Sequence, residues 1–107
     1  MKNDLAQLVE EHLGTAREAK HGRSSEQLVH DGPLRQNLIA VAEGFGLDDH
    51  EPPAAAALLV LRGRVRLTAP SGDVELGEHE FAPIPHERHG LTALEDAAFI
   101  LTTVTGI

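Results

Sequence analysis

Several residue types are scarce or missing in this chain of 107 residues, and each absence excludes a class of site. There is no cysteine, which excludes disulfides, thiolate metal sites, iron–sulfur clusters and cysteine nucleophiles. Tryptophan and tyrosine are also missing, and three phenylalanines are too few for a platform that stacks bases or sugars. Histidine is abundant by contrast, with seven residues.

Positive charge is scarce as well. Nine Lys and Arg face 17 Asp and Glu, so the formal net charge is −8. This charge repels nucleic acid and anionic membranes, and we expect neither as a partner. The longest strongly apolar stretch, 54–61, is too short to span a bilayer, and the N-terminal residues lack the apolar region of a signal peptide. We therefore expect a cytoplasmic protein.

Length and composition predict one domain with one modest core. Apolar residues recur at helical spacing in the first twenty positions: Leu5, Leu8, Val9, Leu13 and Ala16. Asn3 or Asp4 is the expected N-cap, and Gly22 is the expected stop. The pattern predicts an N-terminal helix within 1–22 that packs on a barrel formed by 23–107. A helix that binds a partner is the alternative interpretation.

After Gly22, short runs of β-forming residues alternate with turn residues, as in a sandwich or barrel. The predicted strands are Glu26–His30, Leu34–Glu43, Ala56–Arg62, Arg64–Thr68, Val74–Leu76, Glu80–Ile84, His89–Leu94 and Ala98–Thr103. The segment 70–73 is the clearest hairpin turn. The apolar run 54–61 is predicted to be buried on both faces, and its small alanines suit a crowded interior or a subunit contact.

We expect the charged clusters in this β region to be ordinary surface features. Arg62, Arg64 and Arg66 are expected to be paired or solvated on an outer face, with an anion site as the alternative. The run 78–80 is expected to be a solvated turn. We interpret four histidines as structural or incidental: His12, His21, His30 and His79. His50, His86 and His89 differ because of the residues around them.

A spaced motif surrounds the first of these histidines. Gly44 is followed by five residues and His50, and six residues separate Ala56 from Gly63. This frame resembles the first motif of the cupin superfamily, which reads Gly, five residues, His, one residue, His, three or four residues, Glu, six residues, Gly. Pro52 stands where the second histidine belongs, and Ala56 stands where the glutamate belongs.

The segment Ile84–His89 resembles the proline-rich turn and histidine that end the second cupin motif, although Ala93 replaces the asparagine expected after it. The resemblance covers about 34–104. It implies an all-β fold, a cupin-like double-stranded β-helix or jelly-roll barrel, with the short N-terminal α-helix added. Cupins include metal enzymes, isomerases, binding modules and storage proteins, so the fold leaves the function open.

The resemblance carries over only part of a metal site. A complete cupin site supplies three imidazoles and a carboxylate, whereas this chain retains His50 and His89. His86 or Glu51 would have to substitute, yet residues three apart on a strand point to opposite faces. One hypothesis is therefore a divalent metal (Zn, Fe, Mn or Ni) held by His50, His86 and His89. The other is that His50 and His89 line a pocket without metal.

Three functions follow from these observations. The leading hypothesis is a cupin-like protein that binds a small molecule in the barrel without a complete standard metal site. The first alternative is a metal-dependent oxygenase or isomerase that uses His50 and His89 with a substitute third ligand. The second alternative is a structural or regulatory homodimer, and we expect a homodimer in any case. No residue can be assigned a catalytic role.

Overall fold

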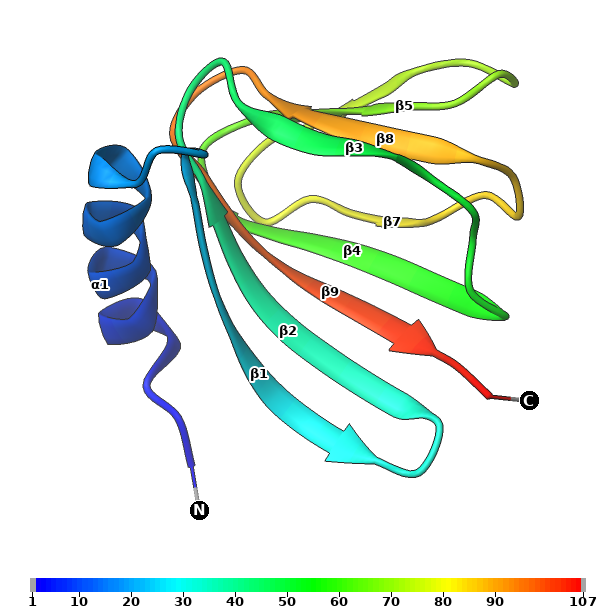
Figure 1. The fold of residues 1–107 in the computed structure, drawn as a ribbon, viewed down its shortest axis with the longest axis horizontal. Helices are drawn as coiled ribbons and strands as arrows, with labels where there is room; N and C mark the ends of the chain where they lie inside the picture. The colour runs from blue at the N-terminus through cyan, green and yellow to red at the C-terminus, as the bar shows by residue number, and fades with distance from the viewer. Residues whose placement is uncertain (1, 107) are drawn as a thin grey trace.

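The computed structural model describes residues 2–106 and shows one helix followed by strands in two antiparallel sheets that face each other (Figure 1). The elements are α1 (Leu5–Glu18), β1 (Arg23–Asp31), β2 (Leu34–Val41), β3 (Gly46–His50), β4 (Ala55–Arg62), β5 (Val65–Thr68), β6 (Val74–Leu76), β7 (Phe81–Pro83), β8 (His89–Ala93) and β9 (Ala97–Val104). One sheet has the order β1-β2-β9-β4-β7 and the other β3-β8-β5-β6. The predicted all-β fold with an N-terminal helix is confirmed.

Each of the eight predicted strands overlaps a strand of the structure, but β3 was missed. The predicted strands leave the residues between Glu43 and Ala56 as a connection. The reason is the composition of β3, whose last three residues, Asp48, Asp49 and His50, are all exposed. A strand in which apolar and polar residues do not alternate cannot be recognised from the sequence by its period of two. Its pairing with β8, not its own pattern, makes this segment extended.

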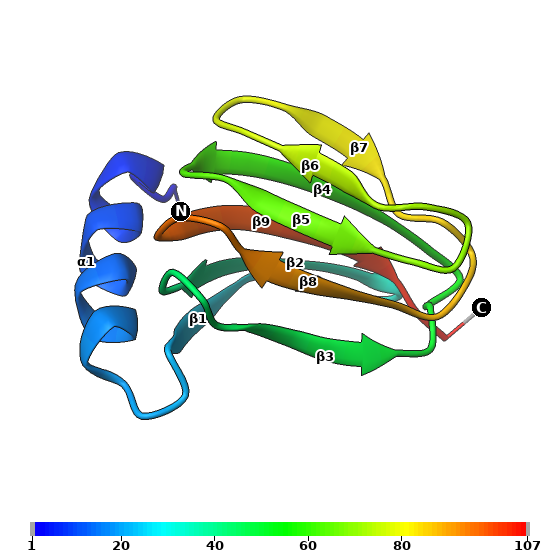
Figure 2. The ribbon, with the colours of Figure 1, turned by 90° about the horizontal axis from the view of Figure 1, so that it is seen from above.

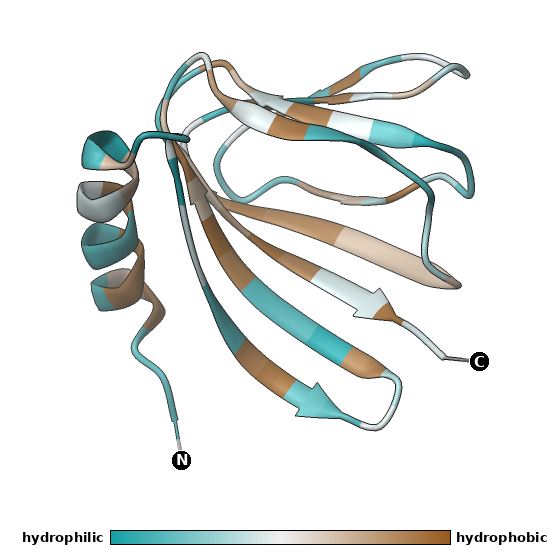
Figure 3. Cartoon of the chain, viewed as in Figure 1, coloured by the Kyte–Doolittle hydropathy of each residue, from teal (hydrophilic) through white to brown (hydrophobic). Residues whose placement is uncertain are grey.

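The two sheets enclose the main core, here called the inner cluster. Its largest fully buried members include Phe99, Leu58, Val41, Val60 and Val65. In β5 the buried Val65 and Leu67 alternate with the half-buried Arg66 and Thr68, as the sequence predicts. Figure 3 shows the resulting apolar bands on β2, β4 and β9. Side chains of successive residues point to opposite faces, so one face of each sheet can fill this core.

Helix α1 packs against the outer face of the five-stranded sheet, beside β1, β2 and β9 (Figure 2). Asp4 is its N-cap, and the Asp4 carboxylate accepts a hydrogen bond from the Gln7 N–H at 3.2 Å. The helix ends at Glu18, before the predicted stop at Gly22, and His21 lies beyond it. Its buried residues belong to a second core, the outer cluster: Val9, Leu13, Ala16, Leu38, Ala40 and Ala98. Within residues 2–106 the structure has no helix of sufficient length and apolarity to cross a membrane.

The apolar run 54–61 is only partly buried, which corrects the prediction of burial on both faces. In β4 the inward side chains Leu58 and Val60 are buried, whereas Leu59 on the outer face is half-buried and Ala55 is exposed. Helix α1 lies over the outer face of β2 and β9 and contacts β4 at its last residues, Leu61 and Arg62. The outer face of β4 beyond the helix is therefore left uncovered in the single chain.

Asp96, in the turn between β8 and β9, connects three parts of the chain. Its carboxylate accepts hydrogen bonds from Arg17 Nε at 2.7 Å and from the Glu43 backbone N–H at 2.8 Å. Arg17 lies in the last turn of α1 and Glu43 follows β2. The Arg17 guanidinium, followed by the Glu43 N–H, lowers the pKa of the Asp96 carboxyl below its ordinary value.

Asp96→Asn should lower the free energy of unfolding by about 1 kcal/mol at neutral pH, because the carboxylate is partly exposed and its ion pair is screened. A lowered folded-state pKa gives stability that is present above the ordinary carboxyl pKa and disappears as pH falls through the folded value. Urea unfolding at neutral and at acid pH measures this. The difference in free energy of unfolding between wild type and Asp96→Asn should disappear in acid. Glu95→Gln, at an exposed neighbouring residue, should have the same free energy of unfolding as wild type at both pH values. A difference of equal size for Asp96→Asn at both pH values contradicts the assignment.

Candidate functional site

Two of the three singled-out histidines, His50 and His89, lie next to each other in the structure. His50 in β3 and His89 in β8 are directly paired across the four-stranded sheet. Their ring centroids are 4.4 Å apart, with an edge-to-face angle of 64°. His89 is buried, with 4% of its surface exposed, whereas His50 is exposed. The two imidazoles therefore form one site that has a buried and a solvent-facing member.

The backbone sets the orientation of both rings in the same way. His50 Nδ1 lies 3.0 Å from the Asp48 carbonyl oxygen, and His89 Nδ1 lies 2.9 Å from the Glu87 carbonyl oxygen. Because a carbonyl oxygen only accepts, each neutral ring carries its proton on Nδ1 and donates it. Both Nε2 atoms then keep a lone pair. This is the tautomer in which an imidazole accepts a hydrogen bond or binds a metal through Nε2.

The space beside the two rings is small and apolar. A cavity of about 20 Å³ is lined by the two histidines and by side chains of the inner cluster, Phe99, Leu58 and Leu67 among them. That volume holds about one water molecule. His50 and His89 thus lie beside a cavity that is too small for an organic ligand.

The donor set at this place does not fit a standard cupin metal centre. Such a centre needs about three protein ligands, and residues 2–106 bring no three His, Cys, Asp or Glu side chains together in a group able to hold a metal. Ala56, at the glutamate position, is half-buried and packs against the inner cluster, on the same face of β4 as Leu58. Pro52, at the second histidine position, is half-buried and has no donor atom in its side chain.

The two proposed substitutes lie elsewhere. Glu51 is exposed and pairs with Arg88, with 3.1 Å between Oε1 and NH1. His86 is exposed and lines a different pocket from that of His50 and His89. The structure thus brings together His50 and His89 but not His86. A metal bound by the three histidines stays a prediction, and it would require the turn before β8 to rearrange.

The pocket beside His86 was not predicted from the sequence. It has a volume of about 420 Å³, and its lining includes residues of β6 and β7, which are edge strands of the two sheets. We call it the seam pocket, and its lining residues are Leu67, Ala69, Ser71, Gly72, Val74, Ala82, Pro83, Ile84, Pro85 and His86. Leu67 and Ile84 also line the histidine cavity, so the two spaces share a wall.

Ser71, one of the residues that line the seam pocket, is hydrogen-bonded to Glu87. The Glu87 carboxylate accepts from both the backbone N–H of Ser71, at 3.0 Å, and the Ser71 hydroxyl. The Ser71 hydroxyl is the largest cause that lowers the pKa of the Glu87 carboxyl, and the Ser71 backbone N–H adds to it. This link ties the tip of the β5–β6 hairpin to the turn that carries His86. The polar atoms of Ser71 are therefore occupied, which leaves the pocket lining mainly apolar.

Arg62, Arg64 and Arg66 are each paired with a carboxylate, as expected for charges on an outer face. Arg64 and Arg66 both contact the Glu75 carboxylate, with Arg66 NH2 at 2.9 Å, and Arg62 contacts Glu10 on α1. The segment 78–80 is a turn, as expected. There Glu80 accepts from the Gly77 N–H at 2.6 Å, and 80% of the His79 side chain is exposed.

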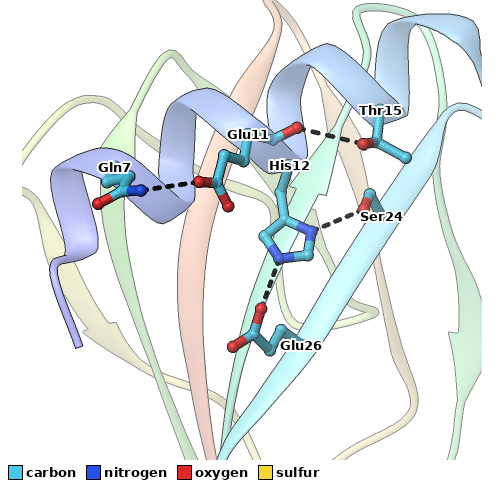
Figure 4. A network of polar contacts seen from close by, with 6 residues as sticks. All are labelled: Gln7, Glu11, His12, Thr15, Ser24 and Glu26. Atoms are coloured by element: carbon cyan, nitrogen blue, oxygen red, sulfur yellow. Dashed lines mark hydrogen bonds and ion pairs between the residues drawn. The ribbon is translucent and has the colours of Figure 1, made fainter. Parts of the chain in front are cut away.

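One histidine interpreted as incidental is not a solvated surface residue. Only 15% of the His12 side chain is exposed, and its two ring nitrogens contact Ser24 and Glu26 on β1 (Figure 4). The sequence carried no signal for this contact, because it depends on how α1 lies across the sheet.

Comparisons with known proteins support the fold. No protein-family model and no curated protein matches the sequence. The structure is similar to that of a conserved protein of unknown function from Streptococcus pyogenes (TM-score 0.75, 21% identity, covering 83% of this chain and 79% of that one). It is also similar to a cupin superfamily protein from Desulfitobacterium hafniense DCB-2 (0.74, 18%, 83% and 84%) and to an RmlC-like cupin from Shewanella frigidimarina NCIMB 400 (0.73, 17%, 83% and 81%). The chain has the cupin fold.

Adding the two missing ligand types should create metal binding. Pro52→His combined with Ala56→Glu should bind Zn²⁺ at least roughly tenfold more tightly than the parent chain. Residues that only hydrogen-bond to metal ligands change metal affinity by about tenfold or more, and a direct ligand should contribute at least as much. Pro52→His with Ala57→Glu is the matched control, since Ala57 lies on the opposite face of β4. Calorimetry with Zn²⁺ and circular dichroism measure binding and folding.

The parent protein, purified without a histidine tag, provides the baseline by elemental analysis. Stoichiometric metal that only strong chelation removes, and that His50→Ala and His89→Ala each abolish, would establish the metal-enzyme alternative. Equal Zn²⁺ binding by the two double variants would contradict the assigned role of position 56.

Proposed function

We propose that this protein binds a small, predominantly apolar molecule in the seam pocket, without a resident metal. The observation that carries the proposal is the contrast between the two spaces. The seam pocket, about 420 Å³, has the size of a ligand site, whereas the histidine cavity, about 20 Å³, has room for about one water molecule. The set of donor groups supports the absence of a resident metal, because two imidazoles are too few for a standard metal centre.

The chemistry of the pocket wall defines the ligand class. Eight of its ten lining residues are aliphatic or glycine, and the two others are Ser71 and His86. Since Ser71 is bound to Glu87, His86 at the rim is the main polar contact that remains. A ligand with an apolar body and at most one polar end fits this wall. Burying the body removes apolar surface from water, which is the main source of affinity in such a site.

The position of the pocket connects it to the rest of the barrel. Leu67 and Ile84 are buried residues of the inner cluster, and they separate the seam pocket from His89. A ligand in the pocket would therefore press on the wall of the histidine cavity. The Ser71–Glu87 hydrogen bonds connect the β5–β6 hairpin, which forms one side of the pocket, to the turn that carries His86 on the other side.

Filling the pocket tests the proposal. Nile red, a neutral apolar dye, should bind wild type with a rise in fluorescence that saturates, and 1-octanol should displace it. Ala82→Phe fills the pocket from its inner wall and should weaken dye binding by at least roughly tenfold. Ala55→Phe, which adds the same group on the exposed end of β4, should leave binding unchanged. No saturable binding by wild type, or equal loss in both variants, would sink the proposal.

We further propose that two copies of the chain associate through an uncovered apolar strip on the outer face of the five-stranded sheet. The strip consists of the exposed Phe81 and Pro83 and the half-buried Leu59 and Ile100, of which Ile100 also packs against the outer cluster. Leu59 is paired with both Phe81 and Ile100, so these side chains share one face, and Phe81 is 65% exposed. All four are uncharged in a chain of net charge −8, and two like-charged copies repel least where no charge faces the other.

Analytical ultracentrifugation at micromolar concentration tests this association. Wild type should sediment as a dimer, and Phe81→Glu should weaken the dimer at least roughly thirtyfold by burying a charge at its centre. Leu34→Glu is the matched control, because Leu34 is an exposed apolar residue outside the strip. A strictly monomeric wild type, or equal weakening in both variants, would contradict the second proposal and leave the ligand proposal standing.

A further inference from the structure

Three side chains with the chemistry of a nucleophilic site meet outside the barrel, where α1 crosses β1 (Figure 4). His12 comes from the helix, and Ser24 and Glu26 come from β1. Ser24 Oγ lies 2.7 Å from His12 Nδ1, and Glu26 Oε1 lies 2.9 Å from His12 Nε2. Because Ser24 and Glu26 are two apart on a strand, both point toward the helix, and the imidazole bridges them.

The positions of the protons follow from these partners. An ionised carboxylate only accepts, so His12 Nε2 carries hydrogen and donates it to Glu26. In the neutral imidazole the lone pair is then on Nδ1, and the Ser24 hydroxyl donates to it. Glu26 therefore selects the tautomer that can take a proton from Ser24. This is the relation of nucleophile, base and orienting acid in serine acyl transfer.

The surroundings keep these contacts from being loose surface bonds. The His12 side chain is 15% exposed, and Ser24 is half-buried beneath the helix. Glu26 is 43% exposed at the solvent side of the group. A shielded imidazole competes less with water for its partners, while the half-buried hydroxyl is still partly open to small molecules. The group lies on the outer face of the sheet and is separate from the seam pocket.

We infer that Ser24 is an activated nucleophile that accepts the acyl group of small esters. Ser24 Oγ forms a bond to the carbonyl carbon while its proton passes to His12 Nδ1 and the π pair of the carbonyl group moves onto the carbonyl oxygen, from which it re-forms the double bond in the next step. The bond from that carbon to the leaving oxygen then breaks, and the leaving alcohol takes the proton from His12. Water releases the acyl group as a carboxylic acid by the same route in reverse, which restores Ser24. Glu26 stays ionised and acts as a positioning residue.

A purely mechanical role for the same contacts makes a different prediction. The bonds also fasten α1 to β1, and fastening alone gives Ser24 no greater reactivity than another serine. The chain offers a direct comparison in Ser25, which is the next residue, is more exposed than Ser24, and points to the other face of β1. Reactivity that follows exposure would favour Ser25, whereas reactivity that follows activation would favour Ser24.

The experiment uses the full chain and p-nitrophenyl acetate, with release of p-nitrophenol and peptide mass mapping as readouts. Acetyl should be found on Ser24 and not on Ser25. Ser24→Ala should remove the acetylated peptide, and Ser25→Ala should change nothing. Glu26→Gln should slow acetylation of Ser24 by at least roughly tenfold, since positioned bases contribute on the order of a hundredfold or more. Glu26→Asp, which keeps the carboxylate, should recover part of the rate.

Circular dichroism and thermal unfolding accompany each variant. Acetylation of Ser25 to the same extent as Ser24 would overturn the inference. It would equally be overturned if Glu26→Gln lowered thermal stability but left the acetylation rate of Ser24 unchanged, because the contacts would then only fasten the helix. Loss of Ser24 acetylation in Glu26→Gln with unchanged circular dichroism supports it.

Discussion

The burial of the first residues of β9, Ala97 to Phe99, on both faces of the sheet is the constraint on which the rest of the structure depends. This strand lies between β2 and β4. Its inward side chain Phe99 is fully buried in the inner cluster, and its outward side chain Ala98 is fully buried beneath α1. The large side chain that points inward packs between the two sheets, while the small side chain that points outward allows the helix to approach closely. The register that β9 imposes on its neighbours then determines which faces of β2 and β4 remain for solvent, ligand or partner.

Complete packing around Phe99 also decides where a ligand site can exist. The same phenylalanine lines the histidine cavity, and with Leu58 it reduces the space beside His89 to about 20 Å³. The opening lies instead where packing ends, because β6 and β7 are strands of three residues at the free edges of the two sheets. Short edges leave the interior uncovered at that side. The closed histidine site and the open seam pocket are thus two results of one core.

Sequence reasoning succeeded where one strand or helix carries its own periodic pattern. The alternation of Val65 and Leu67 with arginine predicted β5, and the stripe that includes Val9 and Leu13 predicted α1. It failed where structure depends on a partner. β3 has no apolar alternation, so the pairing of His50 with His89 was visible only through the motif. The strand parity of His86 and His89 did indicate that they would diverge. The seam pocket and the His12 contacts depend on how separate elements meet, which no local pattern encodes.

The partial cupin motif becomes intelligible when its residues are separated by what each one does. Gly63 has φ +79°, and a Cβ there would lie 2.1 Å from the Asp96 carbonyl oxygen, so the turn requires glycine whether or not a metal is bound. Gly44, with φ +85°, likewise serves the backbone that leads into β3. Positions 52 and 56 have no such backbone duty. A carboxylate at position 56 would face the apolar inner cluster, and without a metal to compensate it would destabilise the fold. Alanine at position 56 avoids the cost of burying a carboxylate. The glycines of the motif are therefore required by the fold, whereas positions 52 and 56 are required only by metal chemistry.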